Sequence, residues 1–317
     1  MIGTLLLSAA LLARPMAITL EPFSGLDGGM EVGCMTMTSG HALRGPSGFG
    51  GYSGVSFDDA SQTIFMLSDA GHIVQASLKL QKNGALESLT DASAYKMRRA
   101  DRTEIKGNDT EAFARYGNGW LISRERAHDL VYVTEANGQY NQGEAIAELS
   151  ALEPFTRNGS LEALTSLGDG RYLLIAEDTD EQNQAKVMMW RESGAELHAL
   201  YQSEPNFNVT DMHADLEGDR LFVLERAFSR KLGPRARINV LKLSDVLNAE
   251  PDTVLKPQNL GRMTFFEGAD NMEGITLVRA EDGSDVLLLV SDDNFNAIQR
   301  TVLMTLTIGD SCPLATP

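Results

Sequence analysis

The sequence repeats one short pattern five times, and this repetition constrains the fold more than any other feature. In each copy, an acidic or small residue precedes Gly, Ala or Met, then come a polar turn and an apolar run that ends beside an acidic residue. The copies start at Ser53, Glu111, Glu162, Asp211 and Glu273. Successive starts lie 58, 51, 49 and 62 residues apart. Repeats of this length, built from short strands, are typical of β-propeller blades.

The apolar run of each copy is rich in Leu and β-branched residues, which favours a strand. We expect these runs to be the inner strands of the blades: Thr63–Leu67, Leu121–Ser123, Tyr172–Ala176, Leu221–Leu224 and Val286–Val290. Helical periodicity is weak, with its best candidates at Gly143–Leu152 and Ser244–Leu247. The pattern predicts an all-β fold, a β-propeller of five blades by repeat count, with a sixth blade in a degenerate segment left open.

The first 17 residues have the features of a secretory signal peptide. Leu5–Ala13 is a short apolar run, and Pro15-Met16-Ala17 offers a small residue for cleavage. The run is shorter than the roughly 20 apolar residues of a membrane-spanning helix. We therefore expect residues 18–317 to form a single exported domain, periplasmic or secreted, without a membrane span.

The chain has two cysteines, Cys34 and Cys312, which lie near opposite ends of the predicted domain. Propellers commonly close when a strand from one end of the chain completes the blade begun by the other end. In an oxidising compartment, a disulfide at that junction would lock the ring. The sequence thus predicts closure by pairing of N- and C-terminal strands and favours a Cys34–Cys312 disulfide over two unrelated thiols.

The chain is acidic, with 44 Asp and Glu residues against 27 Lys and Arg residues and a net charge of −17. Such a surface disfavours nucleic acid and anionic membranes as partners. It is compatible with cation binding, although most of these charges simply keep the surface soluble.

Carboxylates recur at equivalent places in the repeats and should converge at the mouth of the propeller channel. Those at the start of the copies are Glu111, Glu162, Asp211 and Glu273, where the first copy has Ser53. Those after the apolar runs are Asp69, Glu125, Glu177, Glu225 and Asp292. Because so many acids repel unless they are protonated, paired or bound to cations, we expect a site for Ca²⁺, with Mg²⁺ as the alternative. Alternatively, these acids accept backbone N–H bonds and only hold neighbouring blades together.

Arginines stand beside some of these acids, notably Arg126 and Arg226. Metal-holding carboxylates next to guanidinium groups are what phosphoester chemistry requires, since both neutralise charge on a phosphoryl group. We therefore expect the acids that start the copies to act as ligands or general bases, the acids after the runs to hold the metal, and the two arginines to contact phosphate. The alternative for each arginine is an ion pair with a neighbouring acid.

Several segments resemble the phytase-like family, described as having esterase-like activity of phytase. They are Asn271-Met272-Glu273-Gly274-Ile275, Leu224-Glu225-Arg226-Ala227-Phe228-Ser229 and Ser291-Asp292-Asp293-Asn294-Phe295-Asn296. With weaker matches in the other copies, the resemblance covers roughly residues 50–308. It implies an exported hydrolase of small phosphoric esters, with Ca²⁺ as cofactor. A non-catalytic propeller that binds a cation, a small ligand or a protein partner is the alternative, because propellers serve unrelated functions.

Overall fold

A computed structural model describes residues 14–23, 29–99, 109–136, 139–149, 159, 161–296 and 298–314 of the chain. Most of the predicted signal peptide, residues 1–13, lies outside the described residues. Among the described residues, no helix combines the length and the apolar character that crossing a membrane requires.

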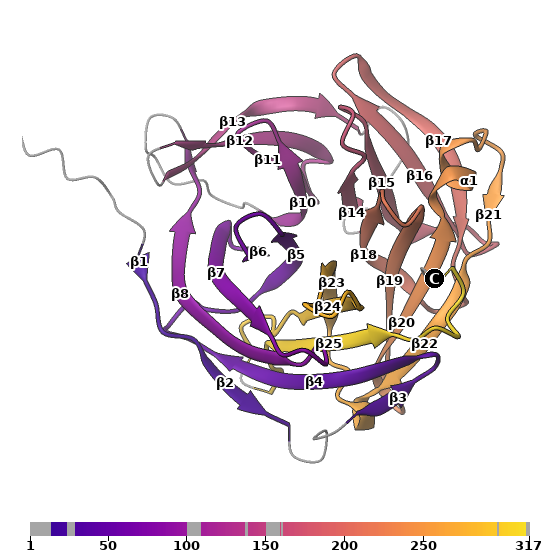
Figure 1. The fold of residues 1–317 in the computed structure, drawn as a ribbon. Helices are drawn as coiled ribbons and strands as arrows, with labels where there is room; N and C mark the ends of the chain where they lie inside the picture. Colours follow the sequence, from indigo (N-terminus) through magenta and orange to yellow (C-terminus); the bar gives the residue numbers. More distant parts are fainter. Residues whose placement is uncertain are drawn as a thin grey trace, which may run out of the picture.

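Five small sheets stand in a ring, which makes the fold a five-bladed β-propeller (Figure 1). Blade 1 contains, from the axis outward, β5 (Tyr52–Asp58), β6 (Thr63–Ser68), β7 (His72–Leu80), β8 (Leu86–Lys96) and β1 (Arg14–Pro15). Blade 2 contains β10 (Thr110–Tyr116), β11 (Gly119–Arg124), β12 (Asp129–Ala136), β13 (Gln139–Glu148) and β9 (Arg98–Arg99). Blade 3 contains β14 (Leu161–Ser166), β15 (Tyr172–Thr179), β16 (Gln184–Arg191), β17 (Gly194–Gln202) and β21 (Val254–Leu255).

The two remaining blades complete the ring. Blade 4 contains β18 (Asn208–Asp215), β19 (Arg220–Ser229), β20 (Gly233–Lys242) and β22 (Gln258–Thr264). Blade 5 contains β23 (Met272–Arg279), β24 (Asp285–Ser291), β25 (Val302–Ile308), β4 (Met35–Arg44) and β2 (Thr19–Pro22), and β3 (Met30–Val32) also pairs with β4. The all-β, five-bladed architecture predicted from the repeats is confirmed.

The five apolar runs form the second strand of each blade, so their assignment as innermost strands is wrong. The innermost strands are instead β5, β10, β14, β18 and β23, which contact one another around the axis (Figure 1). The reason is burial: a second strand has partners on both edges and neighbouring blades on both faces. In β24, for example, every residue after Asp285 is buried. A continuous apolar run suits that environment better than the polar channel.

Of the two helix candidates, one forms a helix and one does not. A short helix, α1 (Leu243–Leu247), confirms the candidate at Ser244–Leu247. The candidate at Gly143–Leu152 is wrong in its described part, because residues up to Glu148 belong to β13. Pairing of β13 with β12 satisfies the backbone there, and two register shifts in that pairing accommodate its irregular pattern.

The ring closes in blade 5, where β4 from the N-terminal part of the chain pairs with β25 from the C-terminal part. The antiparallel register runs from Val302 opposite Ala42 to Ile308 opposite Met35. Beside this junction Cys34 and Cys312 form a disulfide with an S–S distance of 2.02 Å. Both predictions about closure are confirmed.

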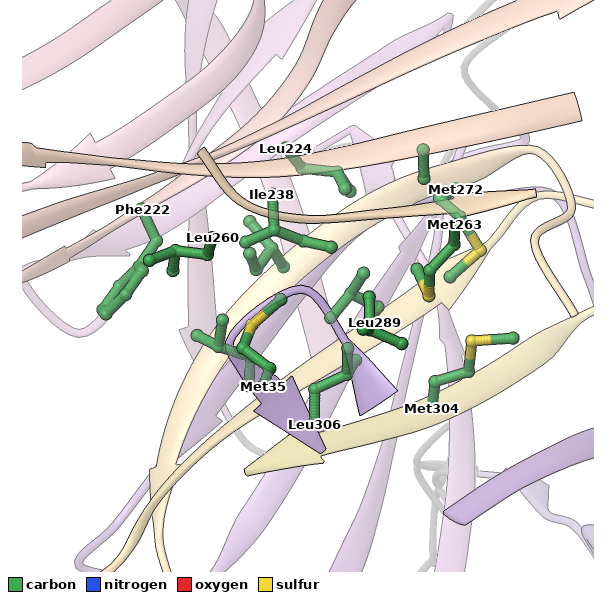
Figure 2. Close-up of a cluster of buried hydrophobic side chains, with 14 of the residues drawn as sticks. Met35, Phe222, Leu224, Ile238, Leu260, Met263, Met272, Leu289, Met304 and Leu306 are labelled. Carbon is green, nitrogen blue, oxygen red and sulfur yellow. The ribbon is translucent and has the colours of Figure 1, made fainter. Parts of the chain in front are cut away.

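A buried apolar cluster joins blade 5 to blade 4 behind this junction (Figure 2). Its labelled members are Met35, Phe222, Leu224, Ile238, Leu260, Met263, Met272, Leu289, Met304 and Leu306. Several are methionines, whose flexible thioethers fill irregular gaps between twisted sheets. The cluster includes residues of β19 and β23, two strands that reach the channel.

Candidate acidic channel site

A β-bulge recurs near the start of every innermost strand and changes the direction of the side chains there. The pairing with the second strand shifts register around Ser53, Glu162 and Glu273, each of which is an extra residue. In blade 2 the shift spans Glu111 and Ala112, and in blade 4 the extra residue is Thr210. A bulge turns a side chain away from the regular alternation of the strand. In blades 2, 3 and 5 the residue turned in this way is a glutamate.

Two groups of three carboxylates meet where blades 2 and 3 adjoin the channel. Asp109, Glu111 and Glu125 form the first group, and Glu125, Glu162 and Glu177 form the second. Within each group, one oxygen from each carboxylate lies within 4.8 Å of the others. Glu125, in the turn after β11, belongs to both groups. Four of these five residues were expected from the sequence to share a site, and the structure brings them together.

Burial and the charges of neighbouring acids raise the pKa of three of these carboxyl groups, those of Glu111, Glu125 and Glu162. The pKa of Glu111 is raised by burial first and then by the charge of Glu125. Burial and the charge of Glu111 raise the pKa of Glu162 in the same way. The pKa of Glu125 is raised to about 7 by partial burial and by Asp109. Each group opposes the ionisation of its neighbours, so a cation placed among them would be strongly favoured.

Arg226, from β19, connects the acids of blades 3 and 5. Its Nε lies 3.0 Å from Glu273 Oε1, and its Nη2 lies 3.4 Å from Glu177 Oε1. Nη1 donates a hydrogen bond of 2.9 Å to Asn271 Oδ1. Burial raises the pKa of Glu273 to about 8, although Arg226 acts in the opposite direction. About a third of the arginine side chain remains exposed.

Arg126 lies on the outer side of the first carboxylate group. Its Nε is 2.7 Å from Asp109 Oδ2, and more than half of the side chain is exposed. This contact makes Arg126 an ion-pair partner of the acids, as the alternative reading of the sequence held. The same position leaves its guanidinium available at the mouth.

Asp69 and Asp292 add acidic groups from blades 1 and 5 to the same region. Burial raises the pKa of Asp292 to about 6, and the charges of Asp69 and Asp293 add to this shift. Burial also raises the pKa of Asp69, and the charge of Asp109 contributes. Asp69 therefore lies within electrostatic reach of both the blade 2 acids and the blade 5 acids.

Two of the expected site residues have other partners. Both carboxylate oxygens of Asp211 accept backbone N–H bonds of 2.8 Å, from Met212 and from Ile275 of the next blade. The cause is the bulge of blade 4, which falls on Thr210 and leaves Asp211 directed toward β23. Glu225 is fully buried and accepts a 2.8 Å hydrogen bond from Arg237. It precedes Arg226 in a strand, so the two side chains point to opposite faces.

Sequence reasoning missed two residues that the structure places at the site, Asp109 and Asn271. Asp109 supplies a carboxylate to the first group, and Asn271 accepts the hydrogen bond from Arg226. Each stands two residues before a glutamate on an innermost strand, Glu111 or Glu273. The other copies have Gly51, Ser160 and Val209 at that position, so comparison of the repeats alone does not single it out.

We use the name channel site for these converging side chains: Asp69, Asp109, Glu111, Glu125, Glu162, Glu177, Glu273, Asp292, Arg126 and Arg226. Fold and site together define a β-propeller with an acidic, arginine-containing channel mouth. A family model described as "Phytase-like: Esterase-like activity of phytase" matches residues 47–295. The chain therefore belongs to the phytase-like family.

Several solved structures are similar in shape at low sequence identity. One, from the crystal structure of a nidogen/laminin complex, has a TM-score of 0.44 and 8% identity, covering 87% of this chain and 88% of that one. Myxococcus xanthus glutaminyl cyclase has a TM-score of 0.43 and 9% identity, with coverages of 82% and 92%. Kuenenia stuttgartiensis hydrazine synthase has a TM-score of 0.40 and 7% identity, with coverages of 82% and 64%. No match was found among curated protein sequences.

Proposed function

We propose that this protein is an exported, Ca²⁺-dependent hydrolase of phosphoric esters that acts at the channel site. The observation that carries the proposal is the pair of three-carboxylate groups that share Glu125, with Arg226 bound to a member of one group and to Glu273. Membership of the phytase-like family supports a phosphoester as the substrate class.

The carboxylate geometry fits a calcium ion. Ca²⁺ takes about six to eight oxygen ligands at about 2.3–2.6 Å, so two oxygens on one ion lie at most about 5 Å apart. The separations within 4.8 Å in each group meet this requirement. Mg²⁺ remains the alternative, but it demands a more regular octahedron and keeps more water. Glu125, which belongs to both groups, would help to hold the cation at either, and a bound cation would polarise a phosphoryl oxygen and lower the pKa of a water molecule.

The chain's own side chains would bind and orient the ester. The exposed part of Arg226 would donate hydrogen bonds to phosphoryl oxygens, and Arg126 would do so from the blade 2 side. Glu273 is buried and belongs to neither carboxylate group, so it would hold a proton at a carboxylate oxygen, whereas Glu111 and Glu162 would be ligands of the cation. In the reaction, water attacks phosphorus, the P–O bond to the alcohol breaks, and the water proton passes to the leaving oxygen. Asp211 and Glu225 would have structural roles only.

Phosphate release from a panel of esters, measured after treatment with a chelator and then with added Ca²⁺ or Mg²⁺, tests the proposal. We expect Ca²⁺-dependent release that is abolished in Glu125→Gln and Glu162→Gln. Glu250→Gln, an exposed acid far along the chain, is the matched control and should retain activity. Absence of release from every ester with either cation, from a folded protein, would refute the enzymatic function.

A second candidate is a non-catalytic propeller that holds a cation or a small ligand at the channel site. It is favoured by the engagement of Arg226, whose guanidinium nitrogens already contact Glu273, Glu177 and Asn271. Calorimetry separates the two functions, because Ca²⁺ binding without turnover of any ester supports this one.

We also propose a periplasmic or secreted location. The Cys34–Cys312 disulfide supports it, since such bonds persist in oxidising compartments. Fractionation of the producing cells, with N-terminal sequencing of the mature chain, checks both the location and cleavage of the signal peptide near residue 17.

A further inference from the structure

We propose that the channel site takes phosphate esters whose alcohol carries an aromatic or other apolar group, and that Phe295 positions that group. This inference rests on the proposed function. It extends that function by naming the chemical class of the alcohol part of the ester. Three features of the structure support it: the place of the Phe295 ring, the backbone that holds it, and the charge of the site.

The Phe295 ring lies at the rim of the channel site beside Asp69. A Cβ atom placed on Gly51 would lie 2.5 Å from Cε2 and Cζ of Phe295 and 2.8 Å from Oδ1 of Asp69. The ring edge and the carboxylate therefore border the same small space, which is left open by a glycine. Half of Phe295 is exposed, so one side of the residue is free to meet a ligand.

The backbone segment that carries this ring is held at a conformational cost. Asn294 and Phe295 both adopt left-handed conformations, with φ of 48° and 49°. A bulky residue rarely occupies this region, and such strain persists only where surrounding contacts impose it. Here Asp292 Oδ1 accepts a 2.6 Å bond from the Asn294 N–H, and Asp293 Oδ1 accepts a 3.0 Å bond from the Phe295 N–H.

The same loop is tied to blade 1. Asp293 Oδ1 also accepts a 2.9 Å hydrogen bond from the Gly51 N–H, and Thr301 donates a 2.9 Å bond to Asp293 Oδ2. The loop therefore presents an apolar surface at a set distance from the acids of the channel site.

The charge of the channel site argues against a polyanionic substrate. The site contains eight carboxyl groups and two arginines. Both arginines are already paired, Arg226 with Glu273 and Glu177, and Arg126 with Asp109. Beyond the one phosphoryl group that the cation and the arginines would bind, each further phosphate on a substrate would add negative charge near these acids. A substrate with a single phosphate, and an apolar group facing Phe295, matches both parts of the surface.

Calorimetry on the Ca²⁺-loaded full chain with two non-hydrolysable probes, phenylphosphonate and methylphosphonate, tests the inference. An aromatic contact of this kind corresponds to roughly a threefold to tenfold difference in affinity. We expect phenylphosphonate to bind tighter by that factor and Phe295→Ala to abolish the difference. Phe295→Leu, which keeps an apolar side chain, should retain part of it. Phe265→Ala is the matched control, since Phe265 is also half exposed but lies after β22.

The outcomes separate this inference from the proposed function. If phenylphosphonate and methylphosphonate bind equally, or if the preference survives in Phe295→Ala, the inference is refuted while phosphoester hydrolysis stands. Faster turnover of an inositol polyphosphate than of phenyl phosphate would refute it as well. If no ester is hydrolysed and neither probe binds in the presence of Ca²⁺, both the inference and the proposed function fail.

Discussion

The stability of the folded chain should fall as pH rises from about 5 to 8, and Ca²⁺ should offset part of that fall. Glu273 carries the argument, because its pKa is raised from 4.5 to about 8 by burial. A group whose pKa is higher in the folded state contributes stability that is fully present below its unfolded value. That stability is lost as pH rises through the folded value.

The size of the effect follows from the shift. At about 1.36 kcal/mol per pKa unit, ionising Glu273 in the folded protein costs on the order of 5 kcal/mol. At roughly 2–4 °C per kcal/mol for a chain of this size class, this corresponds to a fall in Tm on the order of 10 °C. A cation at about 100 times its Kd would return about 2.7 kcal/mol. Its effect should be larger at pH 8 than at pH 5, because protons compete for the same carboxylates.

Thermal unfolding at pH 5 and pH 8, with a chelator or with Ca²⁺, measures these effects. In Glu273→Gln the side chain stays neutral, so the decrease in Tm between the two pH values should become smaller. Glu250→Gln should leave the decrease unchanged. A Tm that stays constant or rises toward pH 8 in chelator would refute this reasoning, as would a larger Ca²⁺ effect at pH 5.

Three further predictions concern other parts of the molecule. Arg226→Met should weaken binding of inorganic phosphate to the Ca²⁺-loaded protein by about tenfold or more, because a charge-assisted hydrogen bond is worth about 1.5–3 kcal/mol. Calorimetry measures the affinity, and an unchanged value would contradict a role of Arg226 in phosphate binding. Asp211→Ala should lower the free energy of unfolding by roughly 2–3 kcal/mol and leave the Ca²⁺ affinity intact, which denaturant titration and calorimetry check together. Reduction of the Cys34–Cys312 disulfide, which spans 278 residues, should lower the free energy of unfolding by about 3–5 kcal/mol; equal unfolding curves with and without reductant would show that the bond is dispensable.

The sequence was sufficient to predict the fold because a repeated strand pattern specifies how many blades must pack side by side. It could not order the strands from the axis outward. An apolar run such as Val286–Val290 predicts a buried strand. It does not predict the position of that strand in the blade, because strands at different distances from the axis can be buried to the same extent. The channel was therefore assigned to the wrong strand of each blade, while the acids that flank the strands were placed near its mouth.

The composition of the site was partly predictable for a similar reason. Glu111, Glu162 and Glu273 fall on or beside the bulges of their strands. Equivalent positions in the sequence repeats therefore occupy equivalent positions in the blades. In blade 4 the bulge falls on Thr210 instead, and this shift of one residue directs Asp211 to the backbone of blade 5. A one-residue change of register cannot be recognised from the residue types alone. In the sequence, Asp211 therefore appeared equivalent to Glu111, Glu162 and Glu273.

Closure of the ring by β4 and β25 has a consequence for how the protein is made. Synthesis starts at the N-terminus, so β4 can meet β2 and β3 early, but its edge for β25 stays open until nearly the whole chain has left the ribosome. An unpaired strand edge is a template for aggregation. A chain cut short before Val302 would therefore leave the edges of β4 and β24 without the strand that joins them in the closed ring.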